Sequence, residues 1–193
     1  MKKFVIALCA LALTACQEAP APFKTEPFAF ERAGAPLLIN VAQIKITENY
    51  QPPLRRPNVE QDFPVAPSTA VRKWAAARLK ASGSSGVLEV VIDDASVKEV
   101  RLPKTEGVKG LFTDDQEARY DAKIAVTLRV YSGAQGISDA TGDVAVTRMR
   151  SINEKATVYQ REAIYQQMTA EMMTDFDREA NARLRQYFTR FIK

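Results

Sequence analysis

In Glu117-Ala-Arg-Tyr-Asp-Ala-Lys-Ile-Ala-Val-Thr-Leu-Arg-Val-Tyr131, apolar and polar side chains alternate. The even-numbered positions, from Ala118 to Val130, are apolar or aromatic, whereas the odd-numbered positions are mostly charged or polar. Because successive side chains of a β-strand point to opposite faces, this alternation predicts a strand with one buried face and one solvated face. Such strands are typical of antiparallel sheets.

The segments that follow complete a hairpin. Ser132-Gly-Ala-Gln-Gly136 is rich in turn-forming residues, and Ala140 to Ile152 is predicted to return as the next strand. Val144 and Val146 share one face of that strand. The same parity then continues in two arginines, Arg148 and Arg150. We therefore expect the apolar inner face to end near Val146.

Two earlier segments are also predicted to be strands, and each is interrupted. Pro36 to Ile46 needs a bulge near Ala42-Gln43 to keep its four β-branched residues on the core side. Val87 to Leu102 alternates up to Asp93-Asp94 and resumes beyond them with a slipped phase. We interpret the two aspartates as a solvated bend. An acid or metal pair is the alternative, but the chain contains no histidine to complete it.

Two amphipathic helices are predicted from apolar residues at helical spacing. The first has Ser68 as its N-cap and ends at Gly83. The second runs from Thr157, which forms a capping box with Gln160, to Phe191. Each presents one apolar stripe, which we expect to pack on the sheet.

These elements predict an α+β fold, a two-layer sandwich with the order β-α-β-β-β-α. Two helices would cover one antiparallel four-stranded sheet, all in a single domain of residues 36–193. A Pro-rich connection from Glu48 to Pro67 joins the first strand to the first helix. We expect Tyr50 and Phe63 to pin this long loop to the core.

The N-terminus predicts an exported protein with a lipid anchor. Lys2 and Lys3 precede an apolar run that is too short to span a bilayer as a helix. Leu13-Thr-Ala-Cys16 then resembles the lipobox of bacterial lipoproteins. That resemblance implies a signal peptide over residues 1–15 and acyl chains, palmitate among them, on Cys16. The alternative is an ordinary secretory signal with a coincidental cysteine.

Residues 16–35 would then be the lipidated cysteine followed by a Pro-rich tether. Gln17 stands where Gram-negative lipoproteins retained in the inner membrane usually carry Asp. The resemblance therefore implies the outer membrane, with the domain on its periplasmic face, and the inner membrane is the alternative.

Composition argues against several classes of function. Removing Lys2 and Lys3 leaves 25 of the 27 basic residues against 23 acidic ones, a formal charge of about +2. This mild charge, without a dense basic run, does not favour nucleic-acid binding. The chain has no histidine, and acylation would block Cys16, so the commonest general base, the thiol nucleophile and the usual zinc ligands are missing. We expect no catalysis, no metal and no cofactor.

Two families of envelope lipoproteins have similar features. The lipobox, the tether and the order of elements resemble lipopolysaccharide-assembly lipoproteins of the LptE type, most closely over Arg119–Val130, Ala140–Arg150 and the terminal helix. Tyr50–Pro57 and Val71–Ala75 resemble the auxiliary lipoproteins of lipid-trafficking ABC systems, the PqiC type. Either resemblance implies a non-catalytic adaptor, whose partner would be a β-barrel protein or an ABC/MCE transport component.

Candidate partner-binding residues lie in two loops. The connection over residues 103–113 carries Leu111 and Phe112, which would dock on a partner or fold back on the core. Two lysines in the same connection could meet anionic lipid or an acidic partner, namely Lys104 and Lys109. The earlier Pro-rich loop adds two arginines, Arg55 and Arg56.

We therefore predict a periplasm-facing adaptor in envelope biogenesis or in lipid or lipopolysaccharide transport. The competing hypothesis is a carrier that binds a lipid or another small ligand in a cleft between sheet and helices. Its lining would come from Met168, Met172 and Met173, because methionines can form adaptable binding grooves. The alternative is that these methionines are core residues packed against the sheet, as we also expect for Trp74.

Overall fold

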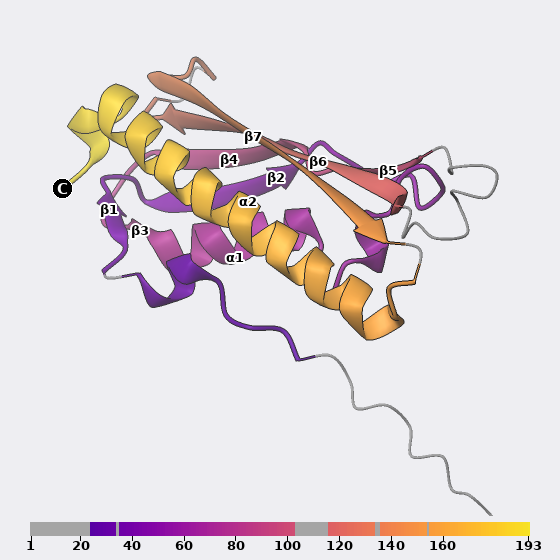
Figure 1. Cartoon of the computed structure of the whole chain (residues 1–193). Helices are drawn as coiled ribbons and strands as arrows, with labels where there is room; N and C mark the ends of the chain where they lie inside the picture. The colour runs from indigo at the N-terminus through magenta and orange to yellow at the C-terminus, as the bar shows by residue number, and fades with distance from the viewer. Residues whose placement is uncertain (1–23, 34, 103–115, 134–135, 154) are drawn as a thin grey trace, which may run out of the picture.

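The computed structural model describes residues 24–33, 35–102, 116–133, 136–153 and 155–193. Two helices, α1 (Pro67–Arg78) and α2 (Val158–Tyr187), pack on one face of a twisted β-sheet (Figure 1). The predicted α+β architecture with two helices is therefore confirmed.

The sheet is built around one long strand, β6 (Gln116–Tyr131). One side of β6 pairs along its length with β7 (Ala140–Asn153). The other side pairs first with β5 (Val97–Arg101) and then with β4 (Val87–Asp94), so two short strands share one edge. The outermost strand on that side is β2 (Gln43–Glu48), which pairs with β4.

The predicted antiparallel four-stranded sheet is wrong, because this sheet has five strands and is mixed. The segment predicted as one interrupted strand over 87–102 forms two strands, and its phase slips as expected at the break between them. The pairing of β2 with β4 is parallel. The physical reason is the crossover through α1, which returns the chain to the sheet in the same direction.

The single bulged strand predicted over 36–46 is instead two strands, because residues 40–42 separate β2 from a further short strand, β1 (Leu37–Ile39), which belongs to another sheet. β1 pairs in parallel with β3 (Leu79–Ala81), and Ile192 forms an antiparallel bridge to Ile39 on its other side. We refer to these three segments as the small sheet. The sequence did not predict it, because the first helix was expected to continue to Gly83.

Both ends of α1 differ from the prediction. The helix begins at Pro67, with Ala66 rather than Ser68 as its N-cap. Proline suits the first helical position, because the amide N–H that it lacks would have no partner there. The helix stops at Arg78, since the next three residues pair with β1.

The core lies between the helices and the inner face of the sheet. Every even-numbered residue of β6 from Ala118 to Val130 is buried, which confirms the alternation. Trp74 of α1 meets Phe176 of α2 edge to face, with 4.9 Å between ring centroids. The Pro-rich loop is pinned as expected, because Phe63 stacks on Tyr165 at 4.3 Å.

The polypeptide joins the core earlier than residue 36. A 3-10 helix, η1 (Ala29–Arg32), buries Phe30 together with the preceding Phe28. The side-chain amide of Gln166 on α2 donates a 3.0 Å hydrogen bond to the carbonyl oxygen of Glu26. Residues 26–32 are thus fixed against α2. Among the described residues, no helix is long and apolar enough to cross a membrane.

Candidate functional site

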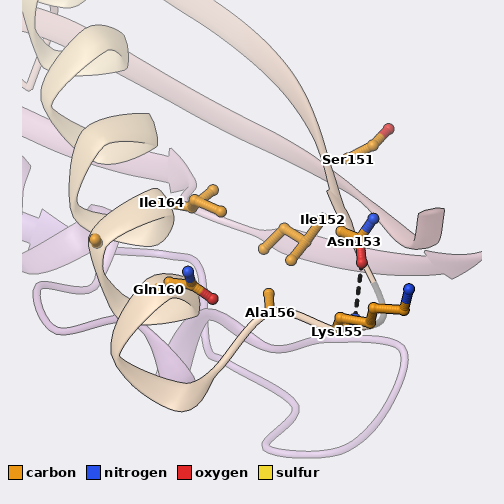
Figure 2. A pocket seen from close by; sticks show the side chains of 8 residues that line it. Ser151, Ile152, Asn153, Lys155, Ala156, Gln160 and Ile164 are labelled. Carbon is orange, nitrogen blue, oxygen red and sulfur yellow. Dashed lines mark hydrogen bonds between the residues drawn. The ribbon is translucent and has the colours of Figure 1, made fainter. Parts of the chain in front are cut away.

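A groove of about 640 Å³ opens where β7 ends and α2 begins (Figure 2). Its floor and walls come from the last residues of the strand, the turn, and the first two turns of the helix. The lining residues are Ser151, Ile152, Asn153, Lys155, Ala156, Gln160, Ala163 and Ile164.

Local hydrogen bonds fix the turn that shapes this groove. The Asn153 side chain accepts a 2.8 Å bond from the backbone N–H of Lys155, and its carbonyl accepts a 3.1 Å bond from the N–H of Ala156. The predicted capping box then starts α2. The Thr157 hydroxyl accepts from the N–H of Gln160, whose side chain accepts from the N–H of Thr157. Hydrogen-bonded backbone at Asn153, Lys155 and Ala156 and at the start of α2 therefore borders the groove.

Apolar groups dominate the depth of the groove, and polar groups lie at its rim. Ile152 is buried, and Ala156, Ala163 and Ile164 are half-buried. Lys155 is the one charged residue in the lining. Such a lining suits an apolar side chain or an acyl chain. Burial of apolar surface there would contribute roughly 25 cal/mol of binding free energy per Å².

Ion pairs join β7 to α2 next to the groove, whose residue Ile152 belongs to the main core. Arg148 of β7 pairs with Asp175 of α2, and Arg150 makes two 2.9 Å hydrogen bonds to the Glu171 carboxylate. The two arginines thus face α2, as their parity predicted. The apolar face does not end at Val146, however, because it resumes at Ile152 in the groove.

Most of the sequence-predicted site residues lie outside the described parts of the chain. This applies to Cys16, Lys104, Lys109, Leu111 and Phe112. The described chain ends at Leu102 before that connection and resumes at Gln116, which is the register partner of Asn153 in the groove lining. Gln116, the first described residue of β6, therefore lies beside the groove.

The two remaining candidates have different surroundings. Arg55 is exposed, whereas Arg56 pairs with Glu99 of β5 and lies 3.5 Å from the Asp62 carboxylate. Arg56 thus helps to hold the Pro-rich loop against β5. The structure does not bring either arginine into the groove lining.

A buried carboxylate anchors the same loop. Glu60 accepts a 2.6 Å hydrogen bond from the Tyr50 hydroxyl and a 3.2 Å bond from the backbone N–H of Val97. Burial, and then the bond to Glu60, raises the pKa of the Tyr50 phenol. Tyr50 and Glu60 thus make their hydrogen bonds within the protein, which indicates that they hold the loop in place.

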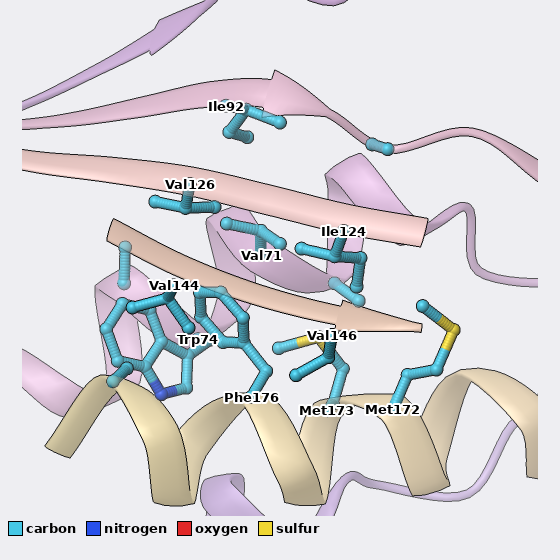
Figure 3. Packing of buried hydrophobic residues seen from close by; sticks show 14 of the residues in the cluster. Val71, Trp74, Ile92, Ile124, Val126, Val144, Val146, Met172, Met173 and Phe176 are labelled. Atoms are coloured by element: carbon cyan, nitrogen blue, oxygen red, sulfur yellow. The ribbon is translucent and has the colours of Figure 1, made fainter. Parts of the chain in front are cut away.

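The methionines predicted to line a ligand cleft are core residues. Met168, Met172 and Met173 are each no more than 1% exposed. Figure 3 shows Met172 and Met173 reaching from α2 toward the sheet, beside Val146. The three methionines belong to the apolar face of α2, which packs on the sheet. The prediction that they line a ligand cleft is therefore wrong.

Sequence reasoning missed the groove residues, although two signals were present. Ile152 keeps the parity of Val144 and Val146 beyond the two arginines, and Ile164 lies on α2 near its start. What could not be read from the sequence is how the end of β7 and the start of α2 are placed around the groove. Among the described residues, no group of three or more potential ligands could hold a metal ion.

No protein-family model matches the chain, and no curated protein matches it. Among solved structures, it is similar to rare lipoprotein B from Shewanella oneidensis, with 13% identity and a TM-score of 0.37 over 72% of this chain and 92% of that one. A minor lipoprotein from Acinetobacter baumannii gives 13% identity and a TM-score of 0.36 over the same shares. A PelC dodecamer from Paraburkholderia phytofirmans gives 14% and 0.21 over 75% of this chain and 94% of that one. TM-scores this low establish neither a common fold nor a family.

Proposed function

We propose that this protein is a non-catalytic adaptor of the bacterial envelope, anchored through lipidated Cys16 on the periplasmic face of the outer membrane. Its pathway would be envelope biogenesis or the transport of lipid or lipopolysaccharide. The observation that carries the proposal is the groove between β7 and α2. It is apolar in its depth and bordered by hydrogen-bonded backbone, and it offers contact surface rather than paired reactive groups.

The groove would receive an apolar side chain from a segment of a partner protein. β7 is an edge strand: it pairs with β6 on one side, and no strand of the described chain lies on the other. Edge strands are ready templates for an added strand. The opposite edge, β2, has six residues against the fourteen of β7, and short edge strands are poorer templates. A segment added to β7 would reach the groove at Asn153.

Anchoring is tested separately from docking. Cys16→Ala should move the protein out of the outer-membrane fraction, because the acyl chains would be lost. Unchanged fractionation would contradict the proposed anchor. Such a result would say nothing about whether the groove binds a partner, which is tested separately.

Docking is tested by crosslinking in living cells from a photoreactive residue placed at Lys155, an exposed residue of the groove lining whose backbone, not its side chain, makes the bond to Asn153. Mass spectrometry of the captured species should identify one envelope protein, either a β-barrel or an ABC/MCE component. Ala163→Arg fills the groove and should abolish that capture. Ala182→Arg introduces the same side chain on an exposed part of α2 and should leave it intact.

Two results would overturn the docking proposal. Equal capture by the Ala163→Arg and Ala182→Arg variants would show that the groove is not used. Recovery of a lipid at fixed stoichiometry, lost only in the Ala163→Arg variant, would favour a carrier instead. Thermal unfolding of both variants shows whether the fold is intact.

A further inference from the structure

The other end of α2 carries a cluster of exposed cations. Four residues gather there around the small sheet and the last turn of the helix: Lys80, Arg185, Arg190 and Lys193. We refer to this cluster as the basic pole. It lies at the opposite end of α2 from the groove, near the C-terminus (Figure 1).

Backbone pairing sets two of these cations beside an exposed leucine. Lys80 is the register partner of Leu38 in the parallel pair of β3 and β1. The backbone N–H of Lys193 donates a 3.0 Å bond to the carbonyl oxygen of Leu38 on the other side of β1. Leu38 is 38% exposed, whereas the adjacent Ile39 is fully buried. The row Lys80, Leu38, Lys193 therefore crosses the solvent face of the small sheet.

Among the described residues, no cation of the pole forms an ion pair with an Asp or Glu side chain within 4.0 Å. Lys193 donates to the carbonyl oxygen of Ser82, and Arg190 donates to the carbonyl of Asp139 while lying over the ring of Phe191. The Asp139 carboxylate accepts the hydroxyl and the N–H of Ser132, and it offsets part of the charge of Arg190. By contrast, Lys45, Lys123 and Arg150 elsewhere on the sheet each have a carboxylate partner.

We propose that the basic pole binds the surface of a bilayer that contains anionic phospholipids. The charge complementarity is direct, because lysines and arginines near a membrane surface are attracted to anionic headgroups. Leu38 lies between two lysines, so it can enter the interface while their ammonium groups stay at the level of the phosphates.

The path of the chain is compatible with such contact. Gln166, which holds the carbonyl of Glu26, lies 21 residues before Tyr187 at the end of α2, or about 32 Å along the helix. Glu26 lies ten positions beyond Cys16, and a chain of that length can span at most about 33–36 Å. If Cys16 is lipidated, as proposed above, the tether is long enough for the pole to touch the same bilayer.

Vesicle binding tests the proposal without the lipid anchor. The chain from residue 17 onward, exported with an ordinary secretory signal, keeps every described residue and lacks the acyl chains. It should co-sediment with phosphatidylcholine vesicles that contain phosphatidylglycerol and not with pure phosphatidylcholine vesicles. Added sodium chloride should weaken this binding, because salt screens exposed charges.

A matched pair of double variants locates the surface. Lys80→Glu with Lys193→Glu should weaken binding to the anionic vesicles by at least about tenfold. Lys98→Glu with Arg101→Glu makes the same charge change on exposed β5 and should leave binding unchanged. Leu38→Asp should also weaken binding, and thermal unfolding of each variant reports whether the fold is retained.

Three results would overturn the proposal: no binding to anionic vesicles, equal binding to neutral vesicles, or an equal loss in both double variants. None of these outcomes depends on an envelope partner or on lipidation of Cys16. Failure here is therefore distinguishable from failure of the adaptor hypothesis.

Discussion

The indole N–H of Trp74 on α1 donates a 2.8 Å hydrogen bond to Oδ1 of Asp177 on α2. The same oxygen accepts from the guanidinium Nε of Arg78 at 2.9 Å and from the side-chain amide of Asn181 at 2.9 Å. One carboxylate thus joins the two helices at the edge of the core, where the Trp74 ring is fully buried.

Replacing Asp177 by Ala should destabilise the protein by about 2 kcal/mol, because a buried indole donor and a mostly buried guanidinium lose their acceptor. Urea unfolding measures the loss. Glu179→Ala removes a more exposed carboxylate of α2 and should change the free energy of unfolding by less than about 0.5 kcal/mol. Equal effects of the two substitutions would show that Asp177 does not join the helices.

Stability should fall in alkaline solution because of Tyr50. Burial, followed by the bond to Glu60, raises the pKa of this phenol above its ordinary value of 10.0. The folded state therefore favours the neutral phenol. Its contribution to stability is complete below pH 10 and is lost as the pH rises from there toward the raised pKa.

Tyr50→Phe should flatten this alkaline decline and lower stability at neutral pH by about 1 kcal/mol, since the hydrogen bond is lost. Urea unfolding on either side of pH 10 measures both effects. Part of the decline should remain, because burial also raises the pKa of Tyr165. An unchanged alkaline slope in the Tyr50→Phe variant would contradict the assignment.

Gly83 is expected to tolerate no side chain. A Cβ atom there would lie 2.7 Å from the carbonyl carbon of Asn40 and 2.8 Å from the backbone nitrogen of Val41. Since backbone rather than a flexible side chain blocks the space, Gly83→Ala should cost about 1–3 kcal/mol of stability. Gly133→Ala is the matched control, because nothing lies within 4 Å of a Cβ at that position. Thermal unfolding of the two variants decides the point.

Met172 should behave as a core residue. Met172→Ala should lower the free energy of unfolding by about 2–5 kcal/mol, because it removes a fully buried side chain. Met149 is 66% exposed on β7, and Met149→Ala should have little effect on unfolding by urea. A small loss for Met172 would revive the idea of a methionine-lined cleft.

Elements with a strong local pattern could be predicted from the sequence. The hairpin of β6 and β7, the capping box of α2 and the break between β4 and β5 follow from alternation, helical spacing and turn residues. Long-range pairing could not be predicted. β3 has only three residues, and its strand conformation depends on β1, some 40 positions earlier in the chain.

The candidate groove was less predictable than the fold. Its lining comes from the end of β7 and the start of α2, and a sequence pattern gives no distance between them. Conversely, the methionines looked like a binding surface because their chemistry suits one. Their burial is decided by the direction in which α2 faces the sheet, which leaves them no opening to solvent.

The bridge between Ile39 and Ile192 has a consequence for the order of folding. These residues are 153 positions apart, so the small sheet cannot close until nearly the whole chain is available. Contacts of such high sequence separation slow folding, because the entropy of closing the intervening loop is lost before the contact stabilises it. We therefore expect the local hairpin of β6 and β7 to form early in folding, and the bridge of Ile192 to Ile39 to form late.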